Sequence, residues 1–331
     1  MSGTDPTRRA HPTAGERLKV LTWHVHGNYL WYLSQLPHDL YLPVTGGADE
    51  GYGGRAGVFP WPDNVHEVRA EDVKHLDVDC VVFQSHRQWA RDQYEVLSED
   101  QRRGPRIFLE HDPPRESPTE TRHPVQDGRA LLVHVTHFNA LMWDNGVTPV
   151  MVVEHGVVVP DAAQWTGELE RGIVVVNNIV RRGRRLGADV FHEARGQVPL
   201  DLVGMGSTDA GGLGEVPPPD LPVFEARYRF FFNPIRYTSL GLAVCEAMAV
   251  GLPIVALATT EMATVVQNGV TGWSSTDLGV LIGHMRRLLH DRDEAAELGT
   301  AAKKVAAERF SIERFARDWG AAFDAARALA A

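Results

Sequence analysis

The hydrophobic positions along the chain form short, continuous runs separated by polar or helical stretches. Five runs lie between residues 18 and 158 and four follow them: LKVLTWHV, DCVVFQS, RIFLEH, ALLVHVT and PVMVVEHGV, then GIVVVNN, VPLDLVGMG, YRFFFNP and PIVALAT. Runs of this length are typical of parallel strands that are buried on both faces. Because segments with helical spacing alternate with them, the pattern predicts an α/β fold of two doubly wound, Rossmann-like domains facing a cleft.

Proline and small polar residues interrupt both patterns in VVPDAAQWTGE, residues 158–168. We therefore predict a first domain over residues 18–163 and a second over residues 164–310, with the boundary near Gln164. Residues 1–17 contain no apolar signal-peptide core and are predicted to form a flexible tail. After residue 276 the pattern is helical, and Ser311 is a suitable N-cap for a last helix over residues 311–331.

The charge and the cysteines narrow the possible functions. The chain has 33 Lys and Arg against 43 Asp and Glu, and this net charge of -10 argues against binding to nucleic acid or to an acidic membrane surface. The longest apolar stretch is interrupted, so no stable membrane insertion is expected. Cys80 and Cys245 lie far apart inside apolar runs. They exclude a disulfide framework and favour a cytoplasmic location.

The most informative segment is NPIRYTSLGLAVCEAMAVGLPIVAL, which predicts a strand, a loop, a helix and a strand. Thr238 or Ser239 is expected to cap the helix, and Gly251 to end it. Glu246 would then lie on an apolar face of the helix, either accepting hydrogen bonds from ligand hydroxyls or serving as an ordinary surface or Arg-paired glutamate. The amides of residues 239–241, Ser239, Leu240 and Gly241, would form an anion site at the positive end of the helix dipole.

The same segment resembles the family-four (group 1) retaining glycosyltransferases of GT-B architecture. Their donor site carries E-G-F-G-L-x-x-x-E-A-M-A-x-G-x-P-V-V-A, and this chain reads T-S-L-G-L-A-V-C-E-A-M-A-V-G-L-P-I-V-A from Thr238 to Ala256. GVTGW, LLHDRDEAAELG and ERFSIERFARDW follow in the family's order, and the last of these resembles the helix with which the family crosses back to its first domain. The resemblance is good over residues 170–328 and looser before them, where IFLEHDPP, VHVTHFNAL and VVEHGV match family positions.

The resemblance implies an enzyme of the EC 2.4 class that transfers a hexose or related sugar with retention. The donor would be a nucleotide-diphosphate sugar, which is a co-substrate, so no separate cofactor is expected. The acceptor stays open among glycans, lipids and small molecules, as do the base, the sugar and the oligomeric state. Two alternatives remain: another GT-B enzyme, such as a nucleotide-sugar epimerase or a phosphorylase, and a degenerate nucleotide-sugar-binding module.

The resemblance also assigns the donor-binding residues. Glu246 would bind the ribose hydroxyls, the amides of Ser239, Leu240 and Gly241 would face the diphosphate or the sugar, and Glu215 and Val216 would flank the base. Two departures motivate the binding-module alternative. Thr238 stands where the family has a sugar-holding glutamate, and Asn178 stands where it has an arginine. Arg182, or else Arg181, could supply the missing cation, unless the RRGRR run is only a solvated turn.

The acceptor side and the catalytic residues are predicted from the first domain. The run WHVHGNYLWYL leads from a strand into the cleft, and His26, Gly27, Asn28 and Trp31 are expected to contact the acceptor. His111 matches the family's cleft histidine and, with Glu110 beside it, would position the sugar or act as an accessory acid or base. The alternative is that Glu110, His111 and Asp112 only bind loop amides.

Metal chemistry is not expected. No HExxH, GxSxG, P-loop or EF-hand pattern occurs, and the acids of Asp77–Asp79 lead into a buried strand.

Overall fold

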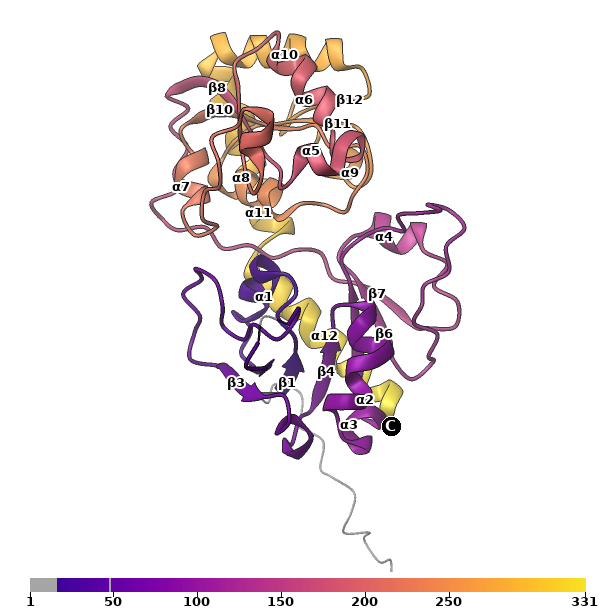
Figure 1. Ribbon diagram of the computed structural model, residues 1–331. Helices are drawn as coiled ribbons and strands as arrows, with labels where there is room; N and C mark the ends of the chain where they lie inside the picture. Colours follow the sequence, from indigo (N-terminus) through magenta and orange to yellow (C-terminus); the bar gives the residue numbers. More distant parts are fainter. Residues whose placement is uncertain (1–16, 48) are drawn as a thin grey trace, which may run out of the picture.

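The computed structural model describes residues 17–47 and 49–331, so the predicted tail lies outside the described residues except for Arg17. Two parallel sheets dominate the architecture, one in each half of the chain (Figure 1). The predicted α/β fold is confirmed. The first sheet has the strand order β3-β2-β1-β4-β5-β6-β7, and the second has the order β12-β11-β10-β8-β9.

The strands are short and parallel throughout. Those of the first sheet are β1 (Lys19–Thr22), β2 (Asp39–Val44), β3 (Val65–Arg69), β4 (Cys80–Phe83), β5 (Arg106–Glu110), β6 (Leu131–His134) and β7 (Val150–Val152). Those of the second are β8 (Leu169–Val175), β9 (Leu200–Val203), β10 (Tyr228–Asn233), β11 (Ile254–Leu257) and β12 (Gly272–Ser275). The hydrophobic pattern missed β2, β3 and β12, since VHEVR of β3 and GWSS of β12 contain few apolar residues and Pro43 interrupts β2.

Helices connect and cover the strands. In the first half they are α1 (Gly27–Leu33), α2 (Gln93–Val96), α3 (Glu99–Arg103) and α4 (His137–Met142). In the second half they are α5 (Ile179–Arg182), α6 (Ala188–Arg195), α7 (Leu221–Glu225), α8 (Leu242–Val250), α9 (Met262–Val265), α10 (Leu278–His290), α11 (Arg292–Arg309) and α12 (Ile312–Ala330). The segment between β7 and β8 contains Gln164 and joins the two sheets.

Successive side chains of a strand pack into different hydrophobic clusters, because they alternate between the two faces of the sheet. In β10, Phe231 belongs to the same hydrophobic cluster as α8 and α11, whereas Phe230 and Phe232 pack into the cluster that contains α6 and α10. The first of these clusters also includes Val20 and Val82 of the first sheet. One apolar core therefore runs through both halves of the molecule.

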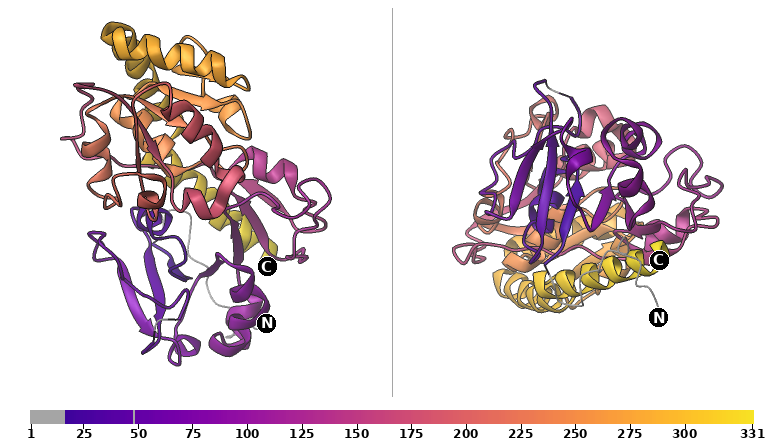
Figure 2. Two further views of the ribbon diagram at one scale, coloured as in Figure 1. Left: turned by 45° about the horizontal axis from the view of Figure 1, so that its top comes forward. Right: turned by 90° about the horizontal axis from the view of Figure 1, so that it is seen from below.

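The last helix, α12, leaves the second sheet and packs against the first. Ser311 caps it by accepting a hydrogen bond from the Arg314 amide, as predicted. The helix contacts β4, β5 and β6, and it runs along the first half of the molecule in both views (Figures 1 and 2). Phe315, Trp319 and Phe323 of α12 are fully or almost fully buried. The core of the first sheet is thus completed by the end of the described chain.

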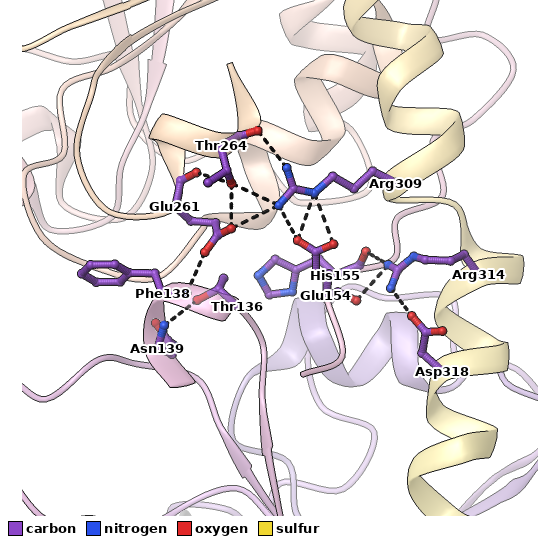
Figure 3. Close-up of polar contacts among 10 residues, drawn as sticks. All are labelled: Thr136, Phe138, Asn139, Glu154, His155, Glu261, Thr264, Arg309, Arg314 and Asp318. Carbon is purple, nitrogen blue, oxygen red and sulfur yellow. Dashed lines mark hydrogen bonds and ion pairs between the residues drawn. The ribbon is translucent and has the colours of Figure 1, made fainter. Parts of the chain in front are cut away.

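Arg309, at the end of α11, links the two halves (Figure 3). Its guanidinium contacts Glu154, which follows β7, with 2.5 Å between Nη2 and Oε1. It also contacts Glu261, with 3.1 Å between Nη2 and Oε1, and donates to the Thr264 carbonyl beside α9. Glu261 in turn accepts a hydrogen bond from the Phe138 amide of α4. Because the Glu261 side chain is only 2% exposed, its charge depends on Arg309 for compensation.

Arg309→Met should therefore destabilise the protein by about 3 kcal/mol, because it leaves a buried carboxylate without its cation. Urea denaturation would measure the loss. Arg103→Met is the matched control, since the Arg103–Glu99 pair is exposed on α3 and should contribute less than about 1 kcal/mol. Equal midpoints for the two variants would contradict the role of Arg309 as a link.

Candidate functional site

A cleft of about 510 Å³ lies between the two halves and is lined by the carboxyl ends of strands from both sheets. This is where open α/β sheets usually bind ligands. Most of the predicted site residues line it, namely His26, Gly27, Asn28, His111, Arg182, Glu215, Val216, Thr238, Ser239, Leu240, Gly241 and Glu246. Trp31 lines a smaller adjoining cavity, whereas Glu110, Asn178 and Arg181 line neither.

The amino end of α8 forms one wall of the cleft. The helix begins at Leu242 with Gly241 as its N-cap and has no side-chain cap, so the predicted caps Thr238 and Ser239 were wrong. The Ser239 hydroxyl instead accepts a hydrogen bond from Asn139 of the first half, with 3.2 Å between Nδ2 and Oγ. A Cβ on Gly241 would meet no protein atom within 4 Å, so a ligand can approach this backbone closely. The first amides of α8 are free to bind an anion there.

Glu246 is buried at the far end of the cleft, with 3% exposure. Its Oε1 accepts a hydrogen bond from the hydroxyl of Tyr32 on α1, at 2.5 Å, across the two halves of the molecule. Burial raises the pKa of Glu246 to about 7, although the Tyr32 bond opposes that shift. Glu246 is therefore neither a surface residue nor paired with an arginine.

Glu225 of α7 is a second buried acid near Glu246. Both of its carboxyl oxygens are buried, and neither has a partner among the described residues. Burial, reinforced by the nearby Glu246, raises the pKa of Glu225 well above its usual range. Ionisation of Glu225 is therefore disfavoured, and a charge on Glu246 disfavours it further.

His111 faces the cleft from the end of β5. Its Nε2 lies 3.2 Å from the Gln84 Oε1. The Gln84 amide nitrogen donates to the carbonyl of Trp23, which can only accept, so Gln84 presents its oxygen to His111. His111 Nε2 must then carry the proton and Nδ1 the lone pair. Burial, with His26 and His155 nearby, lowers the pKa of His111 well below its usual range, so the ring is neutral.

Glu110, which was predicted to be catalytic, does not line the cleft that His111 lines. Its Oε1 accepts a hydrogen bond from the Asp112 amide at 2.8 Å, and its Oε2 lies 3.1 Å from Nε2 of the buried His123. Neighbouring residues of a strand point to opposite faces, and Glu110 is turned toward these structural contacts. The alternative role in binding loop amides holds for Glu110 and not for His111.

Arg182 is the arginine of the RRGRR run that reaches the cleft. Arg181 is exposed outside the cleft, and Arg184 pairs with Asp189 on the surface. Asn178 does not line the cleft and instead adopts the left-handed conformation at the start of α5, with φ 53°. Neither Arg181 nor Asn178, both predicted to bind the donor, lines the cleft. Asn177 faces the cleft instead, and its Oδ1 accepts a hydrogen bond from the Met205 amide.

His155 holds the loop that precedes α8. Its Nε2 donates to the carbonyl of Leu240 at 2.8 Å, and burial lowers the pKa of the ring to about 4. Arg314 of α12 donates to the carbonyls of Glu154 and His155, which fixes this segment beside the Arg309 cluster (Figure 3). The wall of the cleft is therefore positioned by contacts from the other half of the molecule.

Sequence reasoning did not assign Gln84, Asn177 or His155 to the site. They could have been found, because they are polar residues just after β4, β8 and β7, where strands end at the cleft. Tyr32 was expected to stack on a ligand, but its contact with Glu246 gave no signal, since the two residues are 214 positions apart.

Two features are absent from residues 17–47 and 49–331. No group of three or more His, Cys, Asp or Glu side chains is arranged to hold a metal ion there. None of the helices in that part of the chain combines the length and the apolarity that a membrane-spanning segment needs.

Comparison with known proteins confirms the predicted resemblance. Residues 197–291, which include α7, α8 and the cleft wall, match the family described as glycosyl transferases group 1. The O-antigen chain mannosyltransferase B of Escherichia coli is 35% identical over 101 residues. That match covers 30% of this chain and 26% of the relative, so the chain matches about a quarter of the relative's length.

Solved structures confirm the fold over nearly the whole chain. Sucrose-phosphate synthase from Thermosynechococcus elongatus superposes with a TM-score of 0.66 at 14% identity, covering 93% of this chain and 99% of that one. HepE from Anabaena, solved in complex with UDP, superposes with a TM-score of 0.66 at 12% identity, covering 94% and 100%. The fold is the GT-B arrangement of two Rossmann-like halves.

Glu246→Gln should stabilise the unliganded protein above neutral pH. The pKa of Glu246 is about 7 in the folded state against 4.5 ordinarily, so its contribution is complete below about pH 4.5 and is lost as the pH rises through 7. Glutamine stays neutral and can still accept from Tyr32. Denaturation should give similar stabilities near pH 5 and a gain of up to roughly 3 kcal/mol for the variant near pH 8.

Glu297→Gln, at an exposed position of α11, is the control and should change neither value by more than about 0.5 kcal/mol. Some pH dependence should remain in Glu246→Gln because Glu225 contributes with the same sign. Parallel pH profiles for the wild type and Glu246→Gln would contradict the raised pKa.

Proposed function

We propose that this protein is a retaining glycosyltransferase that takes a sugar from a nucleotide-diphosphate sugar bound in the cleft. One observation carries the proposal: Arg182, the uncapped amino end of α8 and the buried Glu246 line the same cleft. A cation and free helix amides suit a diphosphate, and a carboxylate suits the vicinal hydroxyls of a ribose. The match to the family of glycosyl transferases group 1 includes α8 and Glu246.

The donor would lie along the cleft in an order that its chemistry dictates. Glu246 would accept the ribose hydroxyls, with the base near Glu215 and Val216. The diphosphate would meet Arg182 and the amides that begin α8, which places the sugar toward Thr238 and His111. Because the Tyr32 hydroxyl already donates to Glu246 Oε1, a ribose hydroxyl would join or replace a contact of the same kind.

Transfer requires charge stabilisation on the leaving diphosphate and positioning of the sugar. Arg182 would meet the charge that grows on the phosphate, an effect present in the transition state more than in the ground state. The neutral His111 offers the lone pair of Nδ1 to a sugar hydroxyl, with its ring fixed by Gln84. Retention is proposed to follow the family route, in which the leaving phosphate accepts the proton of the acceptor hydroxyl.

Two relatives support this donor class. HepE of Anabaena was solved with UDP-glucose as well as UDP, and the E. coli relative is named a mannosyltransferase. Thermal-shift measurements with UDP-, GDP-, ADP- and dTDP-sugars would identify the base, because a ligand that binds only the folded state raises the melting temperature.

Arg182→Ala should weaken binding of the nucleotide-diphosphate sugar by about tenfold or more and slow its turnover as well. A charge-assisted hydrogen bond contributes about 1.5–3 kcal/mol. Calorimetry and single-turnover kinetics would measure the two effects. Arg181→Ala is the matched control and should change binding less than about twofold, because its side chain is exposed outside the cleft.

Similar losses in both arginine variants would mean that the basic run acts only through its general charge. Binding of the donor without any release of nucleotide diphosphate, with or without acceptors, would instead identify a binding module. Interconversion of the sugar without an acceptor would identify an epimerase.

Thr238 would offer the sugar a neutral hydroxyl where the family has the carboxylate of a glutamate. Free nucleotide diphosphate should therefore bind within about threefold of the complete donor in calorimetry. Thr238→Ala should leave that ratio nearly unchanged. A donor that binds more than about tenfold tighter than its nucleotide diphosphate, with the difference lost in Thr238→Ala, would show that Thr238 grips the sugar.

A further inference from the structure

A second cavity, of about 250 Å³, adjoins the cleft at the junction of the two halves. Its walls are mainly apolar and come from three parts of the chain. Trp31 and Phe59 belong to the first half, Pro160 to the connecting segment, and Pro218 and Pro222 to the second half. Of its lining residues, only Glu246 takes part in the donor placement proposed above.

The polar groups of this cavity are few and partly engaged. Tyr32 and Glu246 line it but are bonded to each other. Asn28 also lines it, and the indole nitrogen of Trp31 is buried without a partner among the described residues. A glycan has a hydroxyl on almost every ring carbon, and most of these would lose water here without gaining a hydrogen bond. The lining therefore favours an apolar occupant.

The cavity and the cleft share three lining residues: Asn28 of α1, and Pro218 and Glu246 of the second half. From Asn28 the chain leads back to Gly27 and His26, which line the cleft. The rings of His26 and His111 are in contact, with centroids 4.2 Å apart. A group anchored in the cavity can thus extend past Asn28 toward His111, where the sugar is placed.

The size and shape of the cavity select a flat group. An apolar cavity of about 150 Å³ encloses a benzene molecule, so about 250 Å³ suits one substituted ring or two fused rings and not a complete long acyl or isoprenoid chain. Trp31 and Phe59 in this wall stack on each other, with ring centroids 6.0 Å apart and an angle of 21° between their planes. Aromatic side chains pack well against another aromatic ring.

We propose that this cavity binds the aromatic ring of the acceptor, so that the acceptor is an aryl compound bearing a hydroxyl group. This inference rests on the proposed function. In the transfer, the acceptor oxygen forms a bond to the anomeric carbon while the bond from that carbon to the phosphate oxygen breaks. The hydroxyl proton passes to the leaving nucleoside diphosphate, so atoms and charge balance.

The test uses the full chain and 4-methylumbelliferone, a fused-ring phenol, as the probe. Binding without any nucleotide is measured by fluorescence, and glycosylation is then followed with the donor identified by thermal shift. Phe59→Ala should weaken probe binding by about three- to tenfold, because an aromatic contact is lost. Val58→Ala is the matched control, since its neighbouring side chain is 60% exposed and does not line the cavity.

Val158→Phe provides a second variant, which fills the cavity from the connecting segment. It should abolish probe binding while the Kd of nucleotide diphosphate changes less than about twofold. Probe binding that survives both Phe59→Ala and Val158→Phe would overturn the proposal. Displacement of nucleotide diphosphate by the probe, or tighter binding of octanol or methyl glucoside than of the probe, would also overturn it.

The two proposals can fail separately. Absence of any nucleotide binding or donor turnover would contradict the proposed glycosyltransferase, whatever the probe does. Donor turnover by hydrolysis with no glycosylation of the probe, and no cavity-dependent binding, would contradict the aryl acceptor alone.

Discussion

The arrangement of the site depends on the cluster around Arg309. One guanidinium contacts carboxylates from both halves, Glu154 after β7 and Glu261 before α9. Glu261 also accepts from the Phe138 amide of α4, so three separate segments converge on the cluster. Buried charges tolerate little displacement because separation would leave each of them uncompensated. This constraint fixes the carboxyl ends of the two sheets opposite each other, which creates the cleft.

The contact between Tyr32 and Glu246 imposes a different constraint, since it joins the halves at a place where a ligand is expected. A carboxyl group that is nearly inaccessible to water and has a pKa of about 7 is costly to ionise. Ligand hydroxyls could replace the missing hydration of that carboxylate. The buried carboxyl group of Glu246 would therefore both destabilise the empty site and increase its affinity for ligands with several hydroxyl groups.

Sequence patterns predicted the double α/β fold because strands buried on both faces have continuous apolar runs. The edge strands β3, with alternating burial, and β12 lack that property and escaped detection, whereas the edge strands β7 and β9 lie in apolar runs and were found. The end of α8 was predicted from Gly251, which adopts φ 105° as a helix-ending glycine does. Its start was misplaced, because Ser239 has the chemistry of a cap but is held by Asn139, a partner 100 residues away.

In the site, too, features that depend on neighbouring residues were predicted from the sequence, whereas contacts between distant residues were not. The burial of Glu246 followed from its apolar neighbours on the helix, whereas its bond to Tyr32 depends on how the halves meet. Glu110 and His111 were grouped because they are adjacent, although alternation along an extended strand already favours opposite directions. Asn178 and Arg181 do not line the cleft, and a sequence does not show which side of the α5 turn faces it.

The path of α12 has a consequence for synthesis on the ribosome. The first sheet is made early, but Phe315, Trp319 and Phe323, which complete its core, are made after the entire second sheet. Domains usually fold in the order in which they emerge. Here the later sheet, whose strands and covering helices α6, α8, α10 and α11 are contiguous in the chain, can close first, while the earlier one waits with an apolar face uncovered. The nascent first half would thus be the part most in need of a chaperone.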